Sequence, residues 1–391
     1  MGDEKSMNIL YLAQHDPRIR TGGNELRTNL LWEVLKKRGH VFTLVYNEIQ
    51  KERYIYVNEE NPICFVNLKR SASRFKIFIY RVINRISGLP ILPFPLVAND
   101  SFAEFYPHEM DVAICRYIQT FYYFHLWNVL PTIVDIDDSP KQVFETVIQQ
   151  TLPRWLRPIG RWLNQLQTRY VLKNISGGWI SNQDQLRWFD ERIKLLPNIP
   201  MGPSAQYNPR SERDNYLFTI GVMGYTPNFV GVDQFLKDIW PSFHKEYPHV
   251  KYIVGGRNAP KDLAEKWNAI DGVSYVGFVD DLETFYSKCL ATVVPIYSGG
   301  GTCIKTLETM AYSRVCLTTP FGVRGIMADD VVPSNGLCTF ENSSEFIFAY
   351  CRLLDEKRRE EMEYGAFLYC DSHYSIDLFV QAVDVVLKSL I

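Results

Sequence analysis

The sequence predicts an α/β fold made of two doubly wound halves, each built on a parallel sheet. Short apolar runs typical of buried strands alternate with segments whose apolar residues recur at helical spacing. This alternation begins at residue 8 and begins again after Leu196-Pro-Asn198. A length of 391 residues also fits two domains better than one. We therefore expect one domain over 1–200, a second over 201–370 and a terminal segment over 371–391.

The first elements set the pattern for the rest of the chain. An apolar run at 8–13 leads into a loop ending in Thr21-Gly22-Gly23-Asn24, and apolar residues then recur at helical spacing until Gly39. The run at 40–46 is strand-like again, and strands joined through a helix are parallel. Further strands are expected at 111–115, 132–135, 178–181, 218–221, 250–254, 273–276, 290–295 and 315–318, and a closing helix at 376–390.

Composition argues against several classes of protein. The chain carries 42 basic and 44 acidic residues, a net charge of −2, which disfavours a surface built to wrap nucleic acid. Its eight cysteines show neither a CxxC pair nor zinc-ligand spacing, as expected for thiols in a reducing compartment. The sequence has no apolar run of about 18 residues and does not begin with a signal-peptide pattern. We expect a cytoplasmic protein with no nucleic-acid partner.

The strongest chemical signal lies at residues 295–311. A strand ends at Pro295, the three glycines 299–301 and Thr302 follow, and a helix begins near Thr302. Bare backbone amides at a helix N-terminus form an anion site suited to a diphosphate. Lys305 and Glu308, three residues apart, share one face of that helix. A lysine for phosphate beside a carboxylate for ribose hydroxyls indicates a nucleotide-diphosphate pocket; the alternative is a solvated salt-bridge pair.

A weaker glycine motif stands in the first half of the chain. Gly22 and Gly23 lie between a strand and a helix, where they either meet the same phosphate or form an ordinary tight turn. The sequence lacks GxGxxG after either first strand and has no GxxxxGK[ST] motif, which disfavours hydride transfer and P-loop hydrolysis.

Three carboxylates end the strand at 132–135, at the edge of the sheet where α/β proteins bind ligands. Two of these carboxylates, Asp137 and Asp138, follow Asp135 in the sequence. Either one is a candidate catalytic residue that accepts hydrogen bonds from a sugar or polarises an acceptor hydroxyl. The alternative is capping of the following helix by Asp138 or Ser139. No further acidic pair with flanking metal ligands is evident, so no metal is expected.

Two segments, 61–99 and 151–173, contain basic residues and no acidic ones. In a helix, the apolar residues from Phe75 to Ile86 form one stripe, and the arginines at 70, 74, 81 and 85 form another face. We expect a basic amphipathic insertion at about 69–99 that suits an anionic membrane surface or a phosphate-bearing acceptor. The alternative is a pair of core helices whose basic sides face solvent.

In order and spacing, these motifs resemble the retaining glycosyltransferases of family 4, which have the GT-B fold. The resemblance covers nearly the whole chain, and its further pieces are Arg38-Gly-His40, Leu196-Pro-Asn198, Gly221 to Asn228, Val254-Gly-Gly256, Gly277-Phe-Val-Asp280 and Thr319 to Gly325. It implies that the C-terminal half binds a nucleotide sugar and that the N-terminal half holds the acceptor. It also implies that the helix within 371–391 crosses back to the N-terminal domain.

The resemblance assigns roles residue by residue. Glu308 matches the second glutamate of the family motif E-x7-E, whereas the first falls on Gly300, giving a subgroup with GGGT-x2-K-x2-E. Donor contacts are then expected from the backbone of Gly299, Gly300, Gly301 and Thr302.

The loop after the first strand of the second half places Gly224, Tyr225 and Asn228 among the expected donor-binding residues. It lacks the Arg and Lys usual in the family there. Lys305 is therefore the expected phosphate cation, supported by Arg257 or Arg324.

The expected function is transfer of a sugar, with retention, from a UDP- or GDP-sugar to a glycan, lipid-linked or polysaccharide acceptor. The nucleotide sugar is a co-substrate; no cofactor and no metal are expected. Lys305, the glycine amides and the helix dipole neutralise the leaving group, and the departing phosphate oxygen takes the proton of the acceptor. The alternatives are a catalytically silent nucleotide-sugar-binding subunit and a nucleotide-sugar epimerase. The basic segments would place the protein peripherally at the inner face of a membrane.

Overall fold

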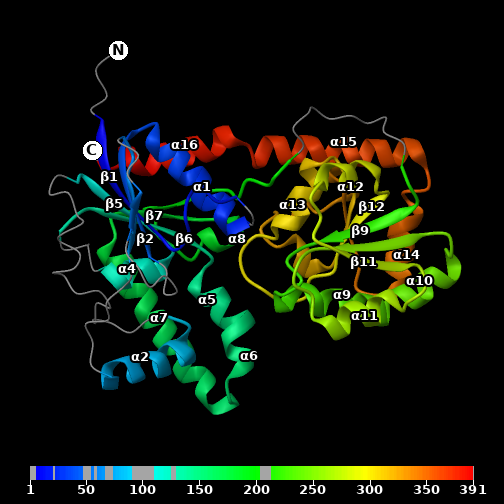
Figure 1. Cartoon of the computed structure of the whole chain (residues 1–391), viewed down its shortest axis with the longest axis horizontal. Helices are drawn as coiled ribbons and strands as arrows, with labels where there is room; N and C mark the ends of the chain where they lie inside the picture. Colours follow the sequence, from blue (N-terminus) through cyan, green and yellow to red (C-terminus); the bar gives the residue numbers. More distant parts are fainter. Residues whose placement is uncertain are drawn as a thin grey trace. The chain divides into compact units, whose positions relative to one another are not determined.

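The computed structural model describes residues 6–20, 23–46, 54–56, 60–66, 74–89, 110–124, 129–202 and 213–390. The chain divides into two compact units: unit 1 is Met1–Pro197 with Asp377–Ile391, and unit 2 is Asn198–Ile376. Each unit has its own sheet, flanked by helices (Figure 1). The predicted α/β fold with two doubly wound sheets is confirmed. Gly22, Arg70 and the ends of the expected insertion, 69–73 and 90–99, lie outside the described residues.

The sheet of unit 1 has the order β3-β4-β2-β1-β5-β6-β7-β8 among the described residues, and all neighbours are parallel except β3 and β4. Its strands are β1 (Met7–Ala13), β2 (Gly39–Tyr46), β3 (Tyr54–Tyr56), β4 (Ile63–Val66), β5 (Val112–Arg116), β6 (Thr132–Asp137), β7 (Gly177–Ile180) and β8 (Ile193–Leu195). Strands β5 and β6 are buried along their whole length, as expected for central strands covered on both faces.

Helices of unit 1 follow the connections between these strands. They are α1 (Gly23–Lys36), α2 (Arg74–Ser87), α4 (Ile118–Phe124), α5 (Pro140–Val143), α6 (Gln149–Thr151), α7 (Arg157–Asn174), α8 (Gln183–Leu186) and α16 (Ile376–Lys388), with a π-helical turn η2 (Phe144–Ile148) and a 3₁₀ turn η3 (Arg154–Leu156). The closing helix α16 packs on this unit, because Arg38 donates to Asp384 at 2.7 and 2.8 Å and the Trp179 indole donates to the Ala382 carbonyl at 3.1 Å.

The sheet of unit 2 is parallel throughout the described residues, in the order β11-β10-β9-β12-β13-β14. Its strands are β9 (Tyr216–Ile220), β10 (Lys251–Gly255), β11 (Val273–Gly277), β12 (Ala291–Val294), β13 (Cys316–Thr318) and β14 (Leu337–Thr339). Its helices are α9 (Thr226–Asp238), α10 (Trp240–Glu246), α11 (Lys261–Asn268), α12 (Leu282–Lys288), α13 (Ile304–Ala311), α14 (Ser343–Cys351) and α15 (Glu356–His373), with 3₁₀ turns η4 (Pro320–Val323), η5 (Ala328–Asp330) and η6 (Pro333–Asn335).

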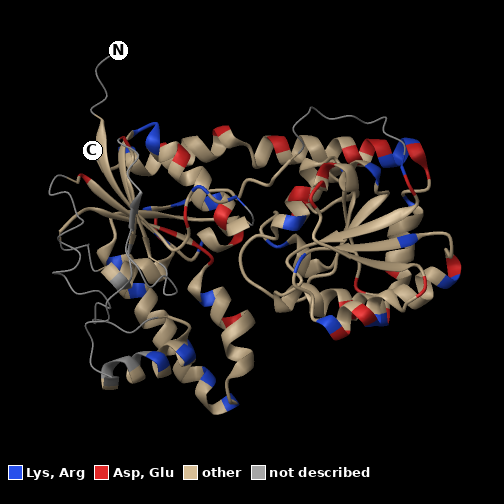
Figure 2. Cartoon of the chain, in the orientation of Figure 1, with Lys and Arg blue, Asp and Glu red and all other residues tan. Residues whose placement is uncertain are grey.

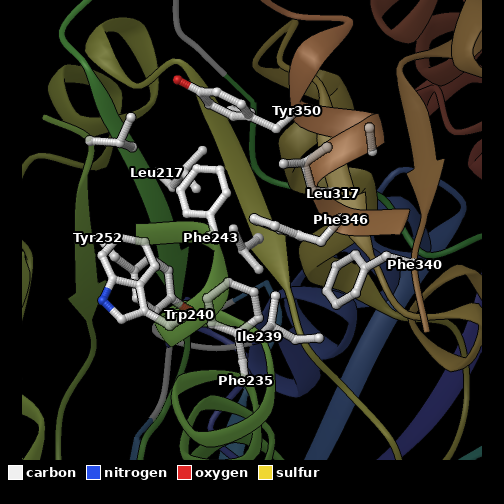
Figure 3. Close-up of a cluster of buried hydrophobic side chains, with 14 of the residues drawn as sticks. Leu217, Phe235, Ile239, Trp240, Phe243, Tyr252, Leu317, Phe340, Phe346 and Tyr350 are labelled. Carbon is white, nitrogen blue, oxygen red and sulfur yellow. The ribbon is translucent and has the colours of Figure 1, made fainter. Parts of the chain in front are cut away.

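One face of this sheet is covered by an aromatic core (Figure 3). Phe235 of α9 lies 5.1 Å from Phe346 of α14, ring centre to ring centre, in an edge-to-face contact. Phe243 of α10 contacts Phe346 and Tyr350 in the same geometry. Aromatic pairs of this kind stabilise a core beyond their buried area, so three helices are fixed to one sheet face.

Two glycines let the loops beyond this sheet approach each other closely. A side chain at Gly256, whose φ is +134°, would place its Cβ 1.6 Å from the Gly221 carbonyl oxygen. A Cβ at Gly231 of α9 would lie 1.8 Å from the Pro295 carbonyl oxygen. The loops after β9, β10 and β12 therefore meet at the carboxyl ends of the strands. None of the helices in the described ranges is both long and apolar enough to cross a bilayer.

Candidate functional site

The loop between β12 and α13 has a conformation that depends on its glycines. Gly299 has a φ of +136° and Gly301 a φ of +60°, both in the region that favours glycine. Helix α13 begins just after them at Ile304, and no side chain caps its N-terminus. The first amides of α13 therefore form an uncapped positive helix end of the kind that binds anions.

Arg324 holds this glycine loop in place. Its Nε and Nη2 donate to the Gly300 carbonyl at 3.1 and 2.9 Å, and its Nη1 donates to the Phe321 carbonyl at 3.2 Å. The next residue, Gly325, lies so close that a Cβ there would be 2.5 Å from Thr302 Oγ1. Arg324, considered from the sequence as a supporting phosphate cation, thus holds the backbone of the glycine loop.

Lys305 of α13 lies against the loop after β9. A Cβ at Gly221 would be 2.6 Å from Lys305 Cε and 3.0 Å from Asn228 Nδ2, so glycine is needed for this approach. Asn228 is buried and donates to the Val222 carbonyl at 2.8 Å. Lys305, Asn228 and the Gly221 loop therefore form one cluster.

Glu308 lies one turn further along α13. Burial raises its pKa to about 7, although the Lys305 ammonium acts in the opposite direction. Burial raises the pKa of Tyr286 and of Tyr312, and the charge of Glu308 raises both further. The two tyrosine rings are stacked, with their centres 4.2 Å apart. Within the described residues, no hydrogen bond or salt bridge joins the side chain of Lys305 or Glu308 to another residue. The two side chains are therefore not a salt-bridge pair.

The other expected donor-binding residues of unit 2 surround this cluster. Gly224 lies beside Asn258, and the half-exposed Tyr225 has its hydroxyl 3.8 Å from the position a Cβ would take at Gly299. Arg257 is exposed, and its carbonyl accepts a hydrogen bond from the Met223 amide at 2.8 Å. The residues predicted in this half thus come together at the carboxyl ends of β9, β10 and β12, the usual ligand edge of such a sheet.

Unit 1 presents a different arrangement at the carboxyl ends of its strands. Arg27 binds both oxygens of Asp135 at 2.7 and 2.9 Å, and Arg116 contacts Asp135 at 3.2 Å and Asp137 at 2.8 Å. All four side chains are buried. Burial acts to raise the pKa of Asp137, but the two arginines hold it below its ordinary value. We call these residues, Arg27, Arg116, Asp135 and Asp137, the buried charge cluster.

The buried charge cluster changes how the sequence-predicted residues of this unit are interpreted. Asp137 has a φ of +61° and its carboxylate is held by two guanidinium groups, a geometry that favours a structural role over proton transfer. Asp138 is only partly buried. Ser139 occupies the N-cap position of α5, but its side chain makes no capping hydrogen bond. Gly23 is the first residue of α1, and its predicted partner Gly22 lies outside the described residues.

Two members of the buried charge cluster were not identified from the sequence. Arg27 is buried in α1 beside Thr28 and Asn29, and Arg116 ends the fully buried strand β5. An arginine that ends an apolar strand requires an acidic partner, so Arg116 gave a usable signal, whereas the polar neighbours of Arg27 gave none. Within the described residues, no group of three or more His, Cys, Asp or Glu side chains is placed to hold a metal ion.

Comparisons with known proteins agree with this geometry. Residues 214–356, which include the glycine loop, Lys305 and Glu308, match the family model "Glycosyl transferases group 1". None of the curated protein sequences matches the chain.

Among solved structures, sucrose-phosphate synthase from Thermosynechococcus elongatus matches with a TM-score of 0.68 at 14% identity, over 98% of this chain and 99% of that one. The UDP-forming α,α-trehalose-phosphate synthase from Burkholderia vietnamiensis gives 0.64 at 10%, over 98% and 100%. Anabaena HepE in complex with UDP gives 0.60 at 13%, over 98% and 100%. These likenesses define the fold as GT-B. Together with the family match, they support a glycosyltransferase of the GT-B type.

Proposed function

We propose that the protein is a retaining glycosyltransferase that moves a sugar from a nucleotide-diphosphate sugar to a glycan, lipid-linked or polysaccharide acceptor. The observation that carries this proposal is α13. Its uncapped N-terminus, Lys305 and Glu308 lie on one short helix, with cation and carboxylate unpaired among the described residues. A diphosphate at the helix end and a ribose beside Glu308 would satisfy each of these groups.

The proposed chemistry is electrostatic. Lys305 and the amides of residues 299–302 oppose the charge that develops on the leaving diphosphate, with Arg324 holding that backbone in position. The departing phosphate oxygen takes the proton of the acceptor hydroxyl, so transfer needs neither a metal nor a dedicated protein base. UDP is the first nucleotide to test, because the HepE structure contains UDP and the Burkholderia enzyme is UDP-forming.

The acceptor is expected to bind unit 1, where Asp138 is the candidate residue for a contact with its hydroxyl group. The buried charge cluster would fix the ends of β5 and β6, on which such a site is built. Its four charges satisfy one another, so they shape this region without reacting.

The test begins with nucleotide binding. A ligand at about 100 times its Kd stabilises a protein by roughly 2.7 kcal/mol, so thermal unfolding with UDP, GDP and their sugars will identify the donor. Lys305→Ala and Glu308→Gln should reduce the shift, whereas Lys261→Ala and Glu361→Gln, at exposed sites of the same unit, should not.

Transfer is then followed with a labelled donor, with and without EDTA. Acceptor-dependent release of the nucleotide with retention at the anomeric carbon is the expected result. Donor binding without any release would instead assign a silent binding subunit, and conversion of the sugar without an acceptor would assign an epimerase. Loss of activity with EDTA that added Mg²⁺ restores would contradict metal independence.

A further inference from the structure

Helix α7 exposes several large apolar side chains to solvent. The residues that it buries are Gly160, Asn164, Gln167 and Val171, at intervals of three and four positions. Those that it exposes at the same spacing are Ile159, Trp162 and Leu166, and Trp162 is 60% exposed. Burial of small and polar residues with exposure of Ile, Trp and Leu is the reverse of an ordinary amphipathic helix.

The buried side of α7 is explained by its contact with α2. A Cβ at Gly160 would lie 2.5 Å from the Ile86 carbonyl oxygen, so the backbone of α2 sits directly on this glycine. Asn164 Nδ2 donates to the Ser87 carbonyl at 2.7 Å and to the Pro140 carbonyl at 3.2 Å. These small and polar residues seat α2 on α7, and the large apolar residues of α7 are left outside the contact.

The neighbouring elements extend the exposed apolar surface. On α2, Phe75 is 70% exposed and Phe78 63% exposed, and Val82 follows on the same side of the helix. On η3, Trp155 is 72% exposed. Isolated surface hydrophobics are ordinary, but several large ones on packed elements mark an interaction site. We call Phe75, Phe78, Val82, Trp155, Ile159, Trp162 and Leu166 the apolar face.

The elements that carry the apolar face also carry positive charge. Arg81, Arg85, Arg154 and Arg161 are exposed on the same elements, and residues 61–99 and 151–173 contain no acidic residue. Figure 2 shows Lys and Arg, without Asp or Glu, along α2 and α7. The whole chain has a net charge of −2, so this concentration of positive charge is local.

We propose that the apolar face and its arginines dock on an anionic lipid surface. Tryptophan and phenylalanine favour the boundary between headgroups and acyl chains, and helices with Arg beside an aromatic side lie in that boundary. The two segments contain no acidic residue to pair with these arginines. Anionic headgroups would supply that negative charge. The apolar side chains supply attachment, and the arginines supply selectivity for anionic lipid.

The experiment measures co-sedimentation of the full chain with vesicles of phosphatidylcholine alone or mixed with phosphatidylglycerol. The apolar variant is Trp155→Gln/Trp162→Gln/Leu166→Gln, and its matched control is Phe348→Gln/Leu354→Gln/Leu368→Gln, at exposed apolar residues of unit 2. The charge variant is Arg81→Gln/Arg85→Gln/Arg154→Gln. Its control, Lys237→Gln/Lys245→Gln/Lys261→Gln, removes the same charge from exposed sites of unit 2.

We expect wild type and both controls to bind the mixed vesicles and to bind phosphatidylcholine far more weakly. The charge variant should need on the order of 100-fold more anionic lipid for half binding, and the apolar variant should lose binding in low salt as well. Circular dichroism and nucleotide binding should be unchanged, because all substituted residues are exposed and none belongs to the donor site.

Three results would overturn the proposal. The first is a wild-type protein that stays in the supernatant with anionic vesicles at low ionic strength. The second is an equal loss of vesicle binding in the variants and in their controls. The third is a dimer that the apolar variant converts to a monomer, since the occupant of the face would then be a second copy of the chain. Nucleotide binding is read separately, so failure here is distinguishable from failure of the proposed glycosyltransferase function.

Discussion

The two units place charged residues at the same edge of the same kind of sheet, with opposite outcomes. In unit 1, Arg27 and Arg116 neutralise Asp135 and Asp137 inside the fold. In unit 2, Lys305 and Glu308 lie on one helix near each other without forming a salt bridge within the described residues. The first set of charges is paired inside the fold, and the second has no hydrogen-bond or salt-bridge partner among the residues that the structure describes.

This difference separates charges that the fold pairs from charges for which a ligand is proposed. A buried pair is retained because removing one partner leaves the other charge unpaired. A carboxylate whose pKa burial raises to about 7 is disfavoured by its own fold at neutral pH. Such a cost is typical of functional sites, and a ligand that donates hydrogen bonds to the carboxylate would remove part of it.

Breaking the buried charge cluster should have the largest effect. Asp135→Asn leaves Arg27 and Arg116 without their shared carboxylate, and the free energy of unfolding of unit 1 should fall by about 3–5 kcal/mol. Urea titration followed by circular dichroism measures it. The control is Asp190→Asn, which breaks an exposed pair with Arg192 and should cost less than about 1 kcal/mol. Equal losses in the two variants would show that the buried charge cluster stabilises unit 1 no more than an exposed ion pair does.

Removing the cation of unit 2 should change catalysis and leave folding intact. Lys305→Ala should lower kcat by on the order of 100-fold or more, the usual cost of losing one electrostatic contact to a developing charge. Uridine binding should be unchanged, because uridine carries no phosphate. The measurement compares steady-state turnover with calorimetry on uridine, and Lys261→Ala is the control. Full turnover in the variant would transfer the phosphate role to Arg257.

Much of the fold could be predicted because the central strands are long apolar runs. Strands β1, β2, β5 and β9 all lie where the pattern indicated them. Strands β3, β4, β8 and β14 were not predicted. Their length of three or four residues does not explain this, because β7, β12 and β13 are as short and lie where the pattern indicated strands. The glycine loop and helix α13 were also visible, since strand, glycines and helix are contiguous in the sequence.

Contacts between distant residues could not be predicted. Arg27 and Asp135 are 108 positions apart, so nothing local in the sequence pairs them. The apolar stripe of α2 was open to interpretation as core, which is wrong for Phe75, Phe78 and Val82 because they are exposed. Periodicity identifies an apolar side, and only the packing of α2 on Gly160 decides which side of each helix is covered.

Glu308→Gln should separate stability from binding. The pKa of Glu308 is raised in the folded protein, so its favourable contribution to stability is present at low pH and is lost as the pH rises through about 7. Glutamine stays neutral at every pH. At about pH 8 the free energy of unfolding of the variant should therefore exceed that of wild type by on the order of 1–3 kcal/mol, which raises its unfolding temperature. Donor affinity should fall by a similar 1–3 kcal/mol, about 5- to 150-fold.

Scanning calorimetry and titration with the donor measure these two quantities, with Glu361→Gln as the control at an exposed site. A variant that binds the donor as tightly as wild type would show that Glu308 is not the ribose ligand. A variant less stable than wild type at this pH would show that its carboxylate is not disfavoured by the fold.

The smallest expected effect is the pH dependence of donor binding. Only ionised Glu308 offers both oxygens to ribose hydroxyls, and its pKa of about 7 lies inside the accessible pH range. Affinity for UDP-glucose should therefore rise about tenfold between roughly pH 6 and pH 8. The sugar nucleotide is the right probe because its diester phosphates do not titrate there, whereas the terminal phosphate of UDP does.

Binding that favours the ionised form of Glu308 also releases a proton at pH 7, which titrations in buffers of different ionisation enthalpy will detect. In Glu308→Gln both the rise and the release should disappear, and a slope that persists in this variant would place the titrating group elsewhere in the protein.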